Sequence, residues 1–210
     1  TILITTGPTY EKIDPVRFIG NYSSGKMGFA LADECASRGA KVILIAGPTQ
    51  QKTRYTSVER YDVESASQMF EAVKEKFPEA NAAILSAAVA DYTPEQVADE
   101  KIKREKTGEM TLALKPTQDI AASLGADKKE GQVLVGFALE TNDEAAHAKG
   151  KLERKNFDFI VLNSLNDKGA GFRVDTNKIT IIDKETTTEF PLKDKKEVAK
   201  DIIDRLVETL

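Results

Sequence analysis

Residues 7–28, GPTYEKIDPVRFIGNYSSGKMG, decide how the rest of this chain is interpreted. A strand-like apolar run, residues 2–6, leads into them, and a helix-like run leaves them. The stretch contains two prolines, four glycines and two adjacent serines. These residues supply unusual backbone angles, N–H groups and hydroxyls at the start of a helix. A loop of this kind has the properties that a phosphate-binding site needs.

Residues 20–27, GNYSSGKM, nearly match the P-loop pattern G-x-x-x-x-G-K-[ST]. The final methionine lacks the hydroxyl that binds magnesium, and the first glycine lies well beyond the end of the strand, where a P-loop would begin. We therefore expect phosphate binding without a P-loop. A helix that starts near Gly25, with Ser23 and Ser24 as capping or phosphate-bonding hydroxyls, attracts a polyphosphate. A serine-capped helix start without a ligand is the open alternative.

The composition favours a small-molecule ligand. The chain has 210 residues, with 30 basic and 34 acidic side chains and a net charge of -4 at pH 7. A broad nucleic-acid surface is therefore not expected, whereas a local basic cluster can hold a small anion. The single cysteine, Cys35, excludes an internal disulfide framework and a cysteine metal site, and it agrees with a reducing, cytoplasmic compartment.

The sequence predicts no membrane segment, because no apolar run approaches the roughly 18 residues of a membrane span. It begins with TILITT, which is typical of a strand and not of a charged signal-peptide leader. This abrupt start suggests a fragment of a longer chain.

The first half of the chain predicts a parallel sheet. A helix is expected over residues 27–38 and a second strand over residues 41–46, which complete a right-handed βαβ unit. A Gly-Pro-Thr triplet follows each of the two strands, at residues 7–9 and 47–49. Both loops are therefore expected at the carboxyl edge of the sheet, where ligands bind in such folds.

Strands and helices continue to alternate. We expect strands at residues 58–63, 82–86, 132–138 and 157–162, helices at residues 64–77, 117–124, 143–156 and 195–210, and an antiparallel pair at residues 179–183 and 188–191. Residues 92–116 are expected to form a flap that contains a strand at residues 109–115, and Thr117 is expected to cap the following helix. The predicted fold class is α/β: a Rossmann-like, mixed and mostly parallel sheet flanked by helices, with a hairpin or flap excursion, in a single domain over residues 1–210.

Six motifs occur in order along nearly the whole chain. They are GPT at residues 7–9, DPVRFIGNYSSGKMG at 14–28, AAVADY at 87–92, KIK at 101–103, GFALETN at 136–142 and GAGF at 169–172. Together they resemble the phosphopantothenoylcysteine synthetase family, and NYSSGKMG is far more specific than a generic glycine pattern. In bacteria this family is usually the carboxyl-terminal half of a bifunctional coenzyme A biosynthesis protein whose other half is a flavin-dependent decarboxylase.

The resemblance implies a ligase of coenzyme A biosynthesis that joins 4′-phosphopantothenate to cysteine, with CTP as co-substrate and Mg2+ as cofactor. An acyl-cytidylate forms with release of pyrophosphate, and cysteine then displaces the nucleotide. Positioning and stabilisation of phosphate charge suffice for this chemistry, so the single histidine, His147, is interpreted as a surface residue. The resemblance also implies a homodimer, in which residues 179–191 or residues 101–115 of the flap reach the neighbouring copy.

The resemblance assigns catalytic roles to two residues. Asn21 matches the family asparagine associated with the acyl-nucleotidyl intermediate, with a plain turn residue as the alternative. Lys101 matches a lysine on a mobile flap that closes over the nucleotide. Gly7 and Lys103 are also expected at the nucleotide, although a solvated surface residue is an alternative for Lys103.

The remaining candidates surround the nucleotide and the substrate. Ser23, Ser24, Gly25 and Lys26 are expected at the triphosphate, and Ala87, Ala88 and Phe137 at the base. Asp91 is expected to bind the ribose or the metal ion, and Arg17 the substrate phosphate. A solvated helix residue is the alternative for Lys26, and a core residue is the alternative for Phe137.

Two other classes of function remain open. A nicotinamide-dependent oxidoreductase shares the fold class, but no G-x-G-x-x-G motif opens the first helix, and no acidic residue ends the second strand. A non-catalytic nucleotide- or partner-binding module shares the pocket, although intact Asn21 and Lys101 argue against it. The sequence proves neither CTP over ATP nor the presence of a decarboxylase half in the native chain.

Overall fold

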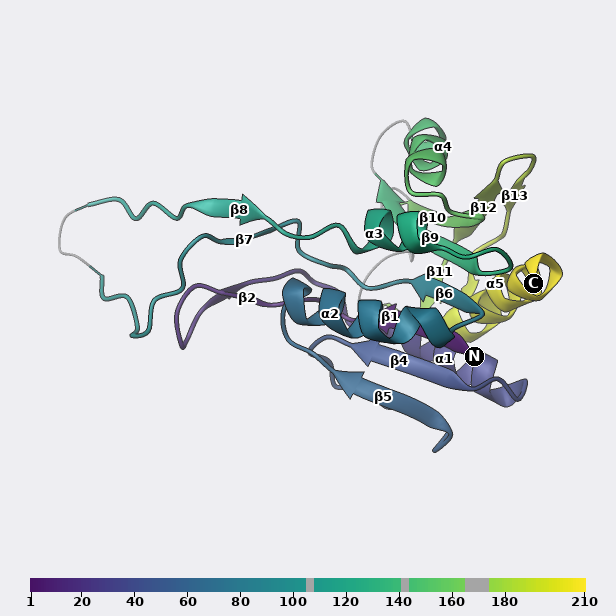
Figure 1. Cartoon of the computed structure of the whole chain (residues 1–210), viewed down its shortest axis with the longest axis horizontal. Coiled ribbons are helices and arrows are strands. Elements are labelled where there is room, and N and C mark those ends of the chain that lie inside the picture. Colours follow the sequence, from purple (N-terminus) through teal and green to yellow (C-terminus); the bar gives the residue numbers. More distant parts are fainter. Residues whose placement is uncertain (105–107, 141–143, 165–173) are drawn as a thin grey trace.

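The computed structural model describes residues 1–104, 108–140, 144–164 and 174–210. Its centre is an eight-stranded sheet in the order β13-β12-β10-β9-β6-β1-β4-β5 (Figure 1). These strands are β1 (Ile2–Thr6), β4 (Val42–Ala46), β5 (Val58–Asp62), β6 (Ala82–Leu85), β9 (Val133–Glu140), β10 (Phe159–Ser164), β12 (Ile179–Asp183) and β13 (Thr187–Glu189). Neighbouring strands from β10 to β5 are parallel, whereas β12 and β13 are antiparallel. The predicted mixed, mostly parallel α/β sheet is confirmed.

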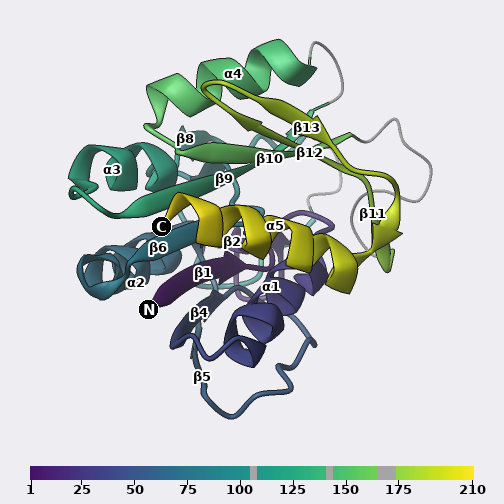
Figure 2. The ribbon, with the colours of Figure 1, turned by 90° about the vertical axis from the view of Figure 1, so that its right-hand side faces the viewer.

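Helices cover both faces of the sheet (Figure 2). They are α1 (Lys26–Ser37) and α5 (Lys195–Thr209) on one face, and α2 (Ala66–Lys76), η1 (Phe77–Glu79), α3 (Ile120–Asp127) and α4 (Glu144–Arg154) on the other. The alternation of β1 explains the two layers: Ile2 and Ile4 belong to the core under α1 and α5, and Leu3 to the opposite core. A strand buried on both faces is apolar at successive positions, as this one is.

Helix α1 packs against α5 through an apolar stripe. Phe29, Leu31 and Cys35 of α1 are buried together with Val198 and Ile202 of α5. Leu31 with Cys35, and Val198 with Ile202, are four residues apart and therefore lie on one face of their helix. The packing fixes α1, and with it the loop that precedes it.

The two Gly-Pro-Thr loops meet at the carboxyl edge of the sheet, as predicted. Strand β1 lies between β4 and β6, so the chain order reverses direction there and the loops after β1 and β6 face each other. The loops pack so closely that a Cβ atom on Gly47 would lie 1.7 Å from the Pro8 carbonyl oxygen. Pro8 in turn forms an isolated parallel bridge with Ala88 after β6.

Two hairpins project from this edge, and Figure 1 shows them extending to the left. The short hairpin is β2 (Glu11–Lys12) with β3 (Phe18–Ile19), and the arm, residues 92–116, carries β7 (Tyr92–Pro94) and β8 (Leu114–Pro116). A third small pair, β11 (Thr176–Asn177) with β14 (Lys193–Asp194), lies beside the start of α5. The arm is the predicted flap.

Three local predictions are wrong. The strand expected at residues 109–115 is confined to β8, since it pairs with β7 over only three residue pairs. Thr117 does not cap α3; the carboxylate of Asp119 accepts the Ala122 N–H at 3.0 Å, while the Thr117 hydroxyl donates to the Ala90 carbonyl. Neither Ser23 nor Ser24 is the N-cap of α1, because that position is taken by Gly25, whose φ of 77° favours glycine.

Within the described ranges, no helix is both long enough and apolar enough to cross a membrane.

Candidate functional site

The last six residues of the NYSSGKMG motif, residues 23–28, form one wall of a pocket of about 140 Å³ at the carboxyl edge of the sheet. The pocket is lined by Thr6, residues 23–28, residues 86–88, residues 137–139, Asn163, Asn177 and Lys195. It therefore brings together Ser23, Ser24, Gly25, Lys26, Ala87, Ala88 and Phe137, all of which the sequence predicted as nucleotide contacts.

Two threonines fix the loop before α1. The hydroxyl of Thr6, the last residue of β1, donates to the Gly25 carbonyl at 2.9 Å, and the hydroxyl of Thr49 donates to the Ser24 carbonyl at 2.8 Å. Gly28 packs so tightly on β1 that a Cβ atom there would lie 2.2 Å from Thr6 Oγ1. The shape of the loop is thus determined by the strand ends beneath it.

Gly7 contributes to the site through its backbone conformation. Its φ is 79°, and a Cβ atom there would lie 3.1 Å from the Gly47 carbonyl oxygen. The residue allows the loops after β1 and β4 to approach each other. Its predicted nucleotide contact stays a prediction.

Two lysines bring positive charge to the pocket. Lys26 Nζ lies 2.7 Å from Asp175 Oδ1, and this hydrogen bond lowers the pKa of Asp175. Lys195 is buried, and its Nζ donates to the carbonyls of Val174 and Thr176. Burial lowers the pKa of Lys195, and the nearby charge of Lys26 lowers it further.

Sequence reasoning missed Lys195, although a signal existed. The residue lies three positions before Val198 and four before Ala199, both of which are buried on α5. A charged residue in register with an apolar helical face is unusual, because a buried charge needs a compensating partner. Here the partners are backbone carbonyls next to the pocket.

Asn21 is placed as a turn residue with one amide hydrogen already used. Its side-chain carbonyl accepts the Ser23 N–H at 3.0 Å, and its Nδ2 donates to the Ala88 carbonyl. The turn role is therefore real. An asparagine amide carries two N–H donors, so the catalytic prediction for Asn21 remains compatible with this geometry.

The backbone of Ala88 is largely engaged within the protein. Its N–H donates to the Gly7 carbonyl at 2.9 Å, and its carbonyl accepts from the Thr9 N–H as well as from Asn21. A carbonyl oxygen has two lone pairs, and both acceptor positions are used here. The sequence predicted that this backbone would form hydrogen bonds with the nucleotide base. That contact stays a prediction, and at Ala88 the backbone groups are already used within the protein.

A second pocket of about 330 Å³ shares Phe137 and Ala87 with the first. It is lined by Thr5, Leu85, Ala87, Val89, Asp91, residues 117–121, Phe137, Lys151, Lys155 and Phe157. Phe137 is half-buried and packs against the core, so it lines a pocket and supports the fold at once. Lys151 and Lys155, which sequence analysis did not select, add positive charge to this side.

Asp91 is exposed at the rim of this second pocket, which also contains Asp119. Asp119 is committed to capping α3 and pairs with Lys155 at 3.1 Å. Across the ranges 1–104, 108–140, 144–164 and 174–210, no group of three or more His, Cys, Asp or Glu side chains could hold a metal ion.

Five predicted site residues are absent from the lining of both pockets: Gly7, Arg17, Asn21, Lys101 and Lys103. Lys101 and Lys103 are exposed on the arm, outside the lining of both pockets. Arg17, expected at the substrate phosphate, instead pairs with Asp14 and donates to the Ile102 carbonyl at 2.9 Å. The motif at residues 169–172 and part of the motif at residues 136–142 fall outside the described residues.

Comparisons with known proteins agree along the whole chain. The family model described as the DNA/pantothenate metabolism flavoprotein C-terminal domain matches residues 1–210. A relative named cysteine/cysteine sulfinic acid decarboxylase, from an unknown prokaryotic organism, is 56% identical over 98% of this chain and 57% of its own length. The coenzyme A biosynthesis bifunctional protein CoaBC of Bacillus subtilis strain 168 is 47% identical over 98% of this chain and 50% of its own length.

Solved structures show the same correspondence. The C-terminal domain of a CoaBC protein superposes with a TM-score of 0.82 at 42% identity, covering 98% of this chain and 92% of that chain. The DNA/pantothenate metabolism flavoprotein from Streptococcus pneumoniae shares the fold, with a TM-score of 0.85 at 24% identity over 100% of this chain and 99% of that chain. The chain spans about half the length of the curated relatives it matches. It therefore belongs to the family of the DNA/pantothenate metabolism flavoprotein C-terminal domain, the phosphopantothenoylcysteine synthetase domain of CoaBC proteins, as its motifs indicate.

Proposed function

We propose that this chain is a CTP-dependent ligase that joins 4′-phosphopantothenate and cysteine through an acyl-cytidylate. The observation that carries the proposal is the pocket beside α1, where residues 23–28 of the motif form a wall, in a chain that matches a CoaBC C-terminal domain over 98% of its length. The alternative function, a nicotinamide-dependent oxidoreductase, was based on the fold class alone, and the family match does not support it.

The proposed triphosphate site is rich in positive charge. The first turn of α1 contributes the positive end of the helix dipole, and Lys26 and Lys195 line the same pocket. The carboxylate that holds Lys26, Asp175, has a side chain that is 80% exposed. Exposed ion pairs contribute little to stability, so Lys26 can exchange Asp175 for a phosphate at small cost.

Asn21 is suited to hold the acyl group. Its bonds to Ser23 and Ala88 fix the orientation of the side chain, which leaves the second amide hydrogen as a donor with a defined direction. A fixed donor stabilises the oxyanion that forms when the cysteine amine attacks the acyl carbonyl. The turn role and the proposed catalytic role thus support each other.

Mg2+ is the proposed cofactor, with Asp91 as its protein ligand. Magnesium at nucleotide sites is commonly held by one or two carboxylates together with phosphates, which fits a single exposed aspartate at the pocket rim. When bound, the ion supplies neutralisation of phosphate charge. Asp91 would hold it from the second pocket, and Lys26 and Lys195 would contact the phosphates in the pocket beside α1.

The test is a pyrophosphate-release assay with 4′-phosphopantothenate, cysteine and Mg2+. CTP is expected to support rapid release and ATP much slower release, because the chain belongs with CoaBC proteins and offers only small residues at positions 87–90. Equal rates with the two nucleotides would contradict the proposed specificity. No release with either nucleotide would contradict the ligase itself.

We also propose a homodimer formed through the arm. Exposed apolar side chains gather on the arm and the short hairpin: Val16, Phe18, Tyr92, Val97, Met110 and Leu114. A narrow projecting hairpin cannot bury these side chains by itself. A second copy of the arm, related by two-fold symmetry, can cover them. Light scattering is expected to give a dimer for the wild type and a monomer for Val97→Asp with Leu114→Asp; a wild-type monomer at micromolar concentration contradicts this.

Within this proposal the chain acts as one nucleotide-binding domain of a cytoplasmic protein. Its relatives are about twice as long and two of them carry names for bifunctional or decarboxylase proteins. A flavin-dependent decarboxylase as the other half of the native chain is therefore part of the proposal, and mass analysis of the native protein tests it.

A further inference from the structure

Both backbone groups of Ile102 on the arm are held by side chains of the short hairpin. The Ile102 N–H donates to Asp14 Oδ2 at 3.1 Å, and the Ile102 carbonyl accepts from Arg17 Nη2 at 2.9 Å. The two side chains also pair with each other through Asp14 Oδ2. We name this arrangement of Asp14, Arg17 and Ile102 the arm clamp.

The arm clamp is a built structure and not a chance surface contact. The Asp14 side chain is 0% exposed, although the arm and hairpin project from the body of the protein. Its Oδ1 accepts the N–H groups of Val16 and Arg17 at 2.9 and 2.8 Å, and its Oδ2 accepts Arg17 Nε at 3.0 Å. The Arg17 guanidinium, together with these backbone donors, holds the pKa of Asp14 well below its usual range.

The arm clamp joins the segments of the two proposed catalytic residues. Arg17 lies four residues before Asn21, and β3 connects the two. Ile102 lies between Lys101 and Lys103. A second bond, from the Ala98 N–H to the Ile13 carbonyl at 3.0 Å, holds the arm and the hairpin in the same register.

Among the residues that the structure describes, the arm's own backbone pairing lies at and next to β7 and β8. Strands β7 and β8 pair over three residue pairs near the base of the arm. Ile102 lies in the segment between these strands and belongs to neither of them. The direction in which Lys101 projects therefore depends on the arm clamp more than on the sheet.

We propose that Asp14 is a positioning residue, which through the arm clamp fixes the backbone at Ile102 and thereby aims Lys101 at the nucleotide phosphates. The proposal rests on the ligase function proposed above. Lys101 would act on the substrate, whereas Asp14 would act only through Ile102 and Arg17.

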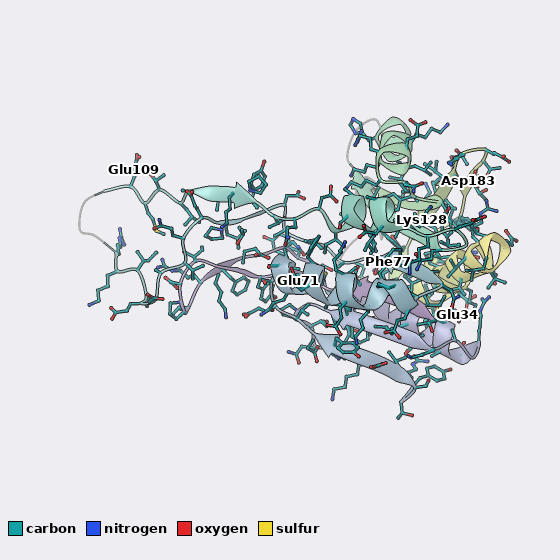
Figure 3. The ribbon with its side chains drawn as sticks, viewed as in Figure 1. Glu34, Glu71, Phe77, Glu109, Lys128 and Asp183 are labelled. Atoms are coloured by element: carbon teal, nitrogen blue, oxygen red, sulfur yellow. The ribbon has the colours of Figure 1, made fainter. Side chains whose placement is uncertain are left out.

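The first experiment tests the arm clamp independently of catalysis, by measuring hydrogen exchange of backbone amides in the full chain. In Asp14→Asn, the Ile102 amide loses a charged acceptor and is expected to exchange on the order of 10- to 100-fold faster. Asp183→Asn is the matched control: Asp183 also pairs with an arginine, Arg205, and accepts two backbone N–H groups, but it lies on the opposite side of the molecule (Figure 3). Exchange at Ile102 should not change in that control.

The second experiment measures pyrophosphate release in a single turnover with CTP, 4′-phosphopantothenate and Mg2+. Asp14→Asn is expected to slow release by about 10- to 100-fold, because a displacement of about 1 Å at a reacting group costs this much. The double variant Asp14→Asn with Lys101→Gln should be no slower than Lys101→Gln alone, since a lysine that is absent cannot be misplaced. A thermal scan of each variant shows that it is folded at the assay temperature.

The outcomes separate the two proposals. Unchanged Ile102 exchange in Asp14→Asn, or rate losses that multiply in the double variant, would overturn the positioning role. If the wild type releases no pyrophosphate, the proposed ligase activity is refuted, and so is the role of Asp14 in aiming Lys101. The exchange result would still establish whether the arm clamp exists. Faster exchange together with non-multiplicative rates supports both.

Discussion

The loop at residues 20–28 and the arm at residues 92–116 carry the two proposed catalytic residues, yet they are held in different ways. The loop lies on the strand ends, where the hydroxyls of Thr6 and Thr49 and the backbone of Ala88 bind it from below. The arm projects from the body and is held to the short hairpin at Ala98 and Ile102. One half of the proposed site is thus packed on the strand ends, and the other half is held by hydrogen bonds between two projecting hairpins.

The largest effect is expected where the packing beneath the loop is broken. In Gly47→Ala the new Cβ atom would lie 1.7 Å from the Pro8 carbonyl oxygen, so a backbone segment must move. We expect a loss of about 4 kcal/mol in the free energy of unfolding, measured by urea denaturation. In the control Gly150→Ala, on α4, the nearest obstacle is the flexible end of Arg154, and a gain of up to about 1 kcal/mol is expected. Equal stability of both variants would show that the loop is not rigidly packed.

The arm is expected to affect the reaction without affecting stability. Lys101→Gln removes an exposed charge and should slow pyrophosphate release by about 3 kcal/mol in activation free energy, because the charge bears on phosphates as they are displaced. Its unfolding midpoint should equal that of the wild type. Lys115→Gln, on β8, removes an equally exposed arm lysine and serves as the control. Pyrophosphate release at the wild-type rate in Lys101→Gln would show that Lys101 has no role in the first half-reaction.

A substitution in the loop distinguishes the two half-reactions. Asn21→Asp keeps the side-chain shape but replaces an amide donor with a carboxylate, so the cysteine step should slow by about 2.7 kcal/mol while some acyl-cytidylate still forms. The intermediate should therefore accumulate, which a quenched reaction resolved by mass can detect. Product formation at the wild-type rate, or loss of both steps together with CTP binding, would reduce Asn21 to its turn role.

The smallest effect concerns acid stability. Burial raises the pKa of Asp183, but hydrogen bonds from Thr186 and the Glu185 N–H and the charge of Arg205 outweigh it, so the net pKa is lowered. A carboxylate with a lowered pKa stabilises the fold above its ordinary pKa of 3.8, and this contribution is lost as the pH falls further.

Asp183→Asn should therefore show a smaller loss of unfolding free energy between pH 5 and pH 3, in the range of about 1 kcal/mol or less. Asp14 has the same direction of shift, but it binds the arm, so its protonation should appear in local amide exchange more than in global unfolding. Identical acid profiles for the wild type and Asp183→Asn would contradict this distinction.

The sequence was sufficient for features in which local pattern and tertiary position agree. The apolar run of β1, the Gly-Pro-Thr triplets and the NYSSGKMG motif all lie where strand and helix periodicity placed them, because glycine positions and buried strands leave few alternatives. Four predicted nucleotide contacts from the motif share one pocket with three from other segments, Ala87, Ala88 and Phe137. Periodicity identified these elements without reference to distant residues.

The misses share a cause: a partner distant in the sequence. Asp14 binds Ile102 across 88 positions, and no pattern near either residue shows this bond. Arg17 binds the Ile102 carbonyl 85 positions away, which its local sequence does not show, and its predicted contact with the substrate phosphate stays a prediction. Thr117 was predicted to cap the helix because the local sequence does not show that its hydroxyl donates to the Ala90 carbonyl, 27 positions away.

The burial of Cys35 has a practical consequence for a protein proposed to act on a thiol substrate. Burial raises the pKa of Cys35 to about 12, and its side chain is only 2% exposed. The protein's one sulfhydryl is thus a poor nucleophile, unable to exchange with cysteine or with a thiol product as a mixed disulfide. A cysteine introduced at an exposed arm position such as Glu109 would therefore react alone with a maleimide dye. Such a label would report the motion of the arm during turnover in single molecules.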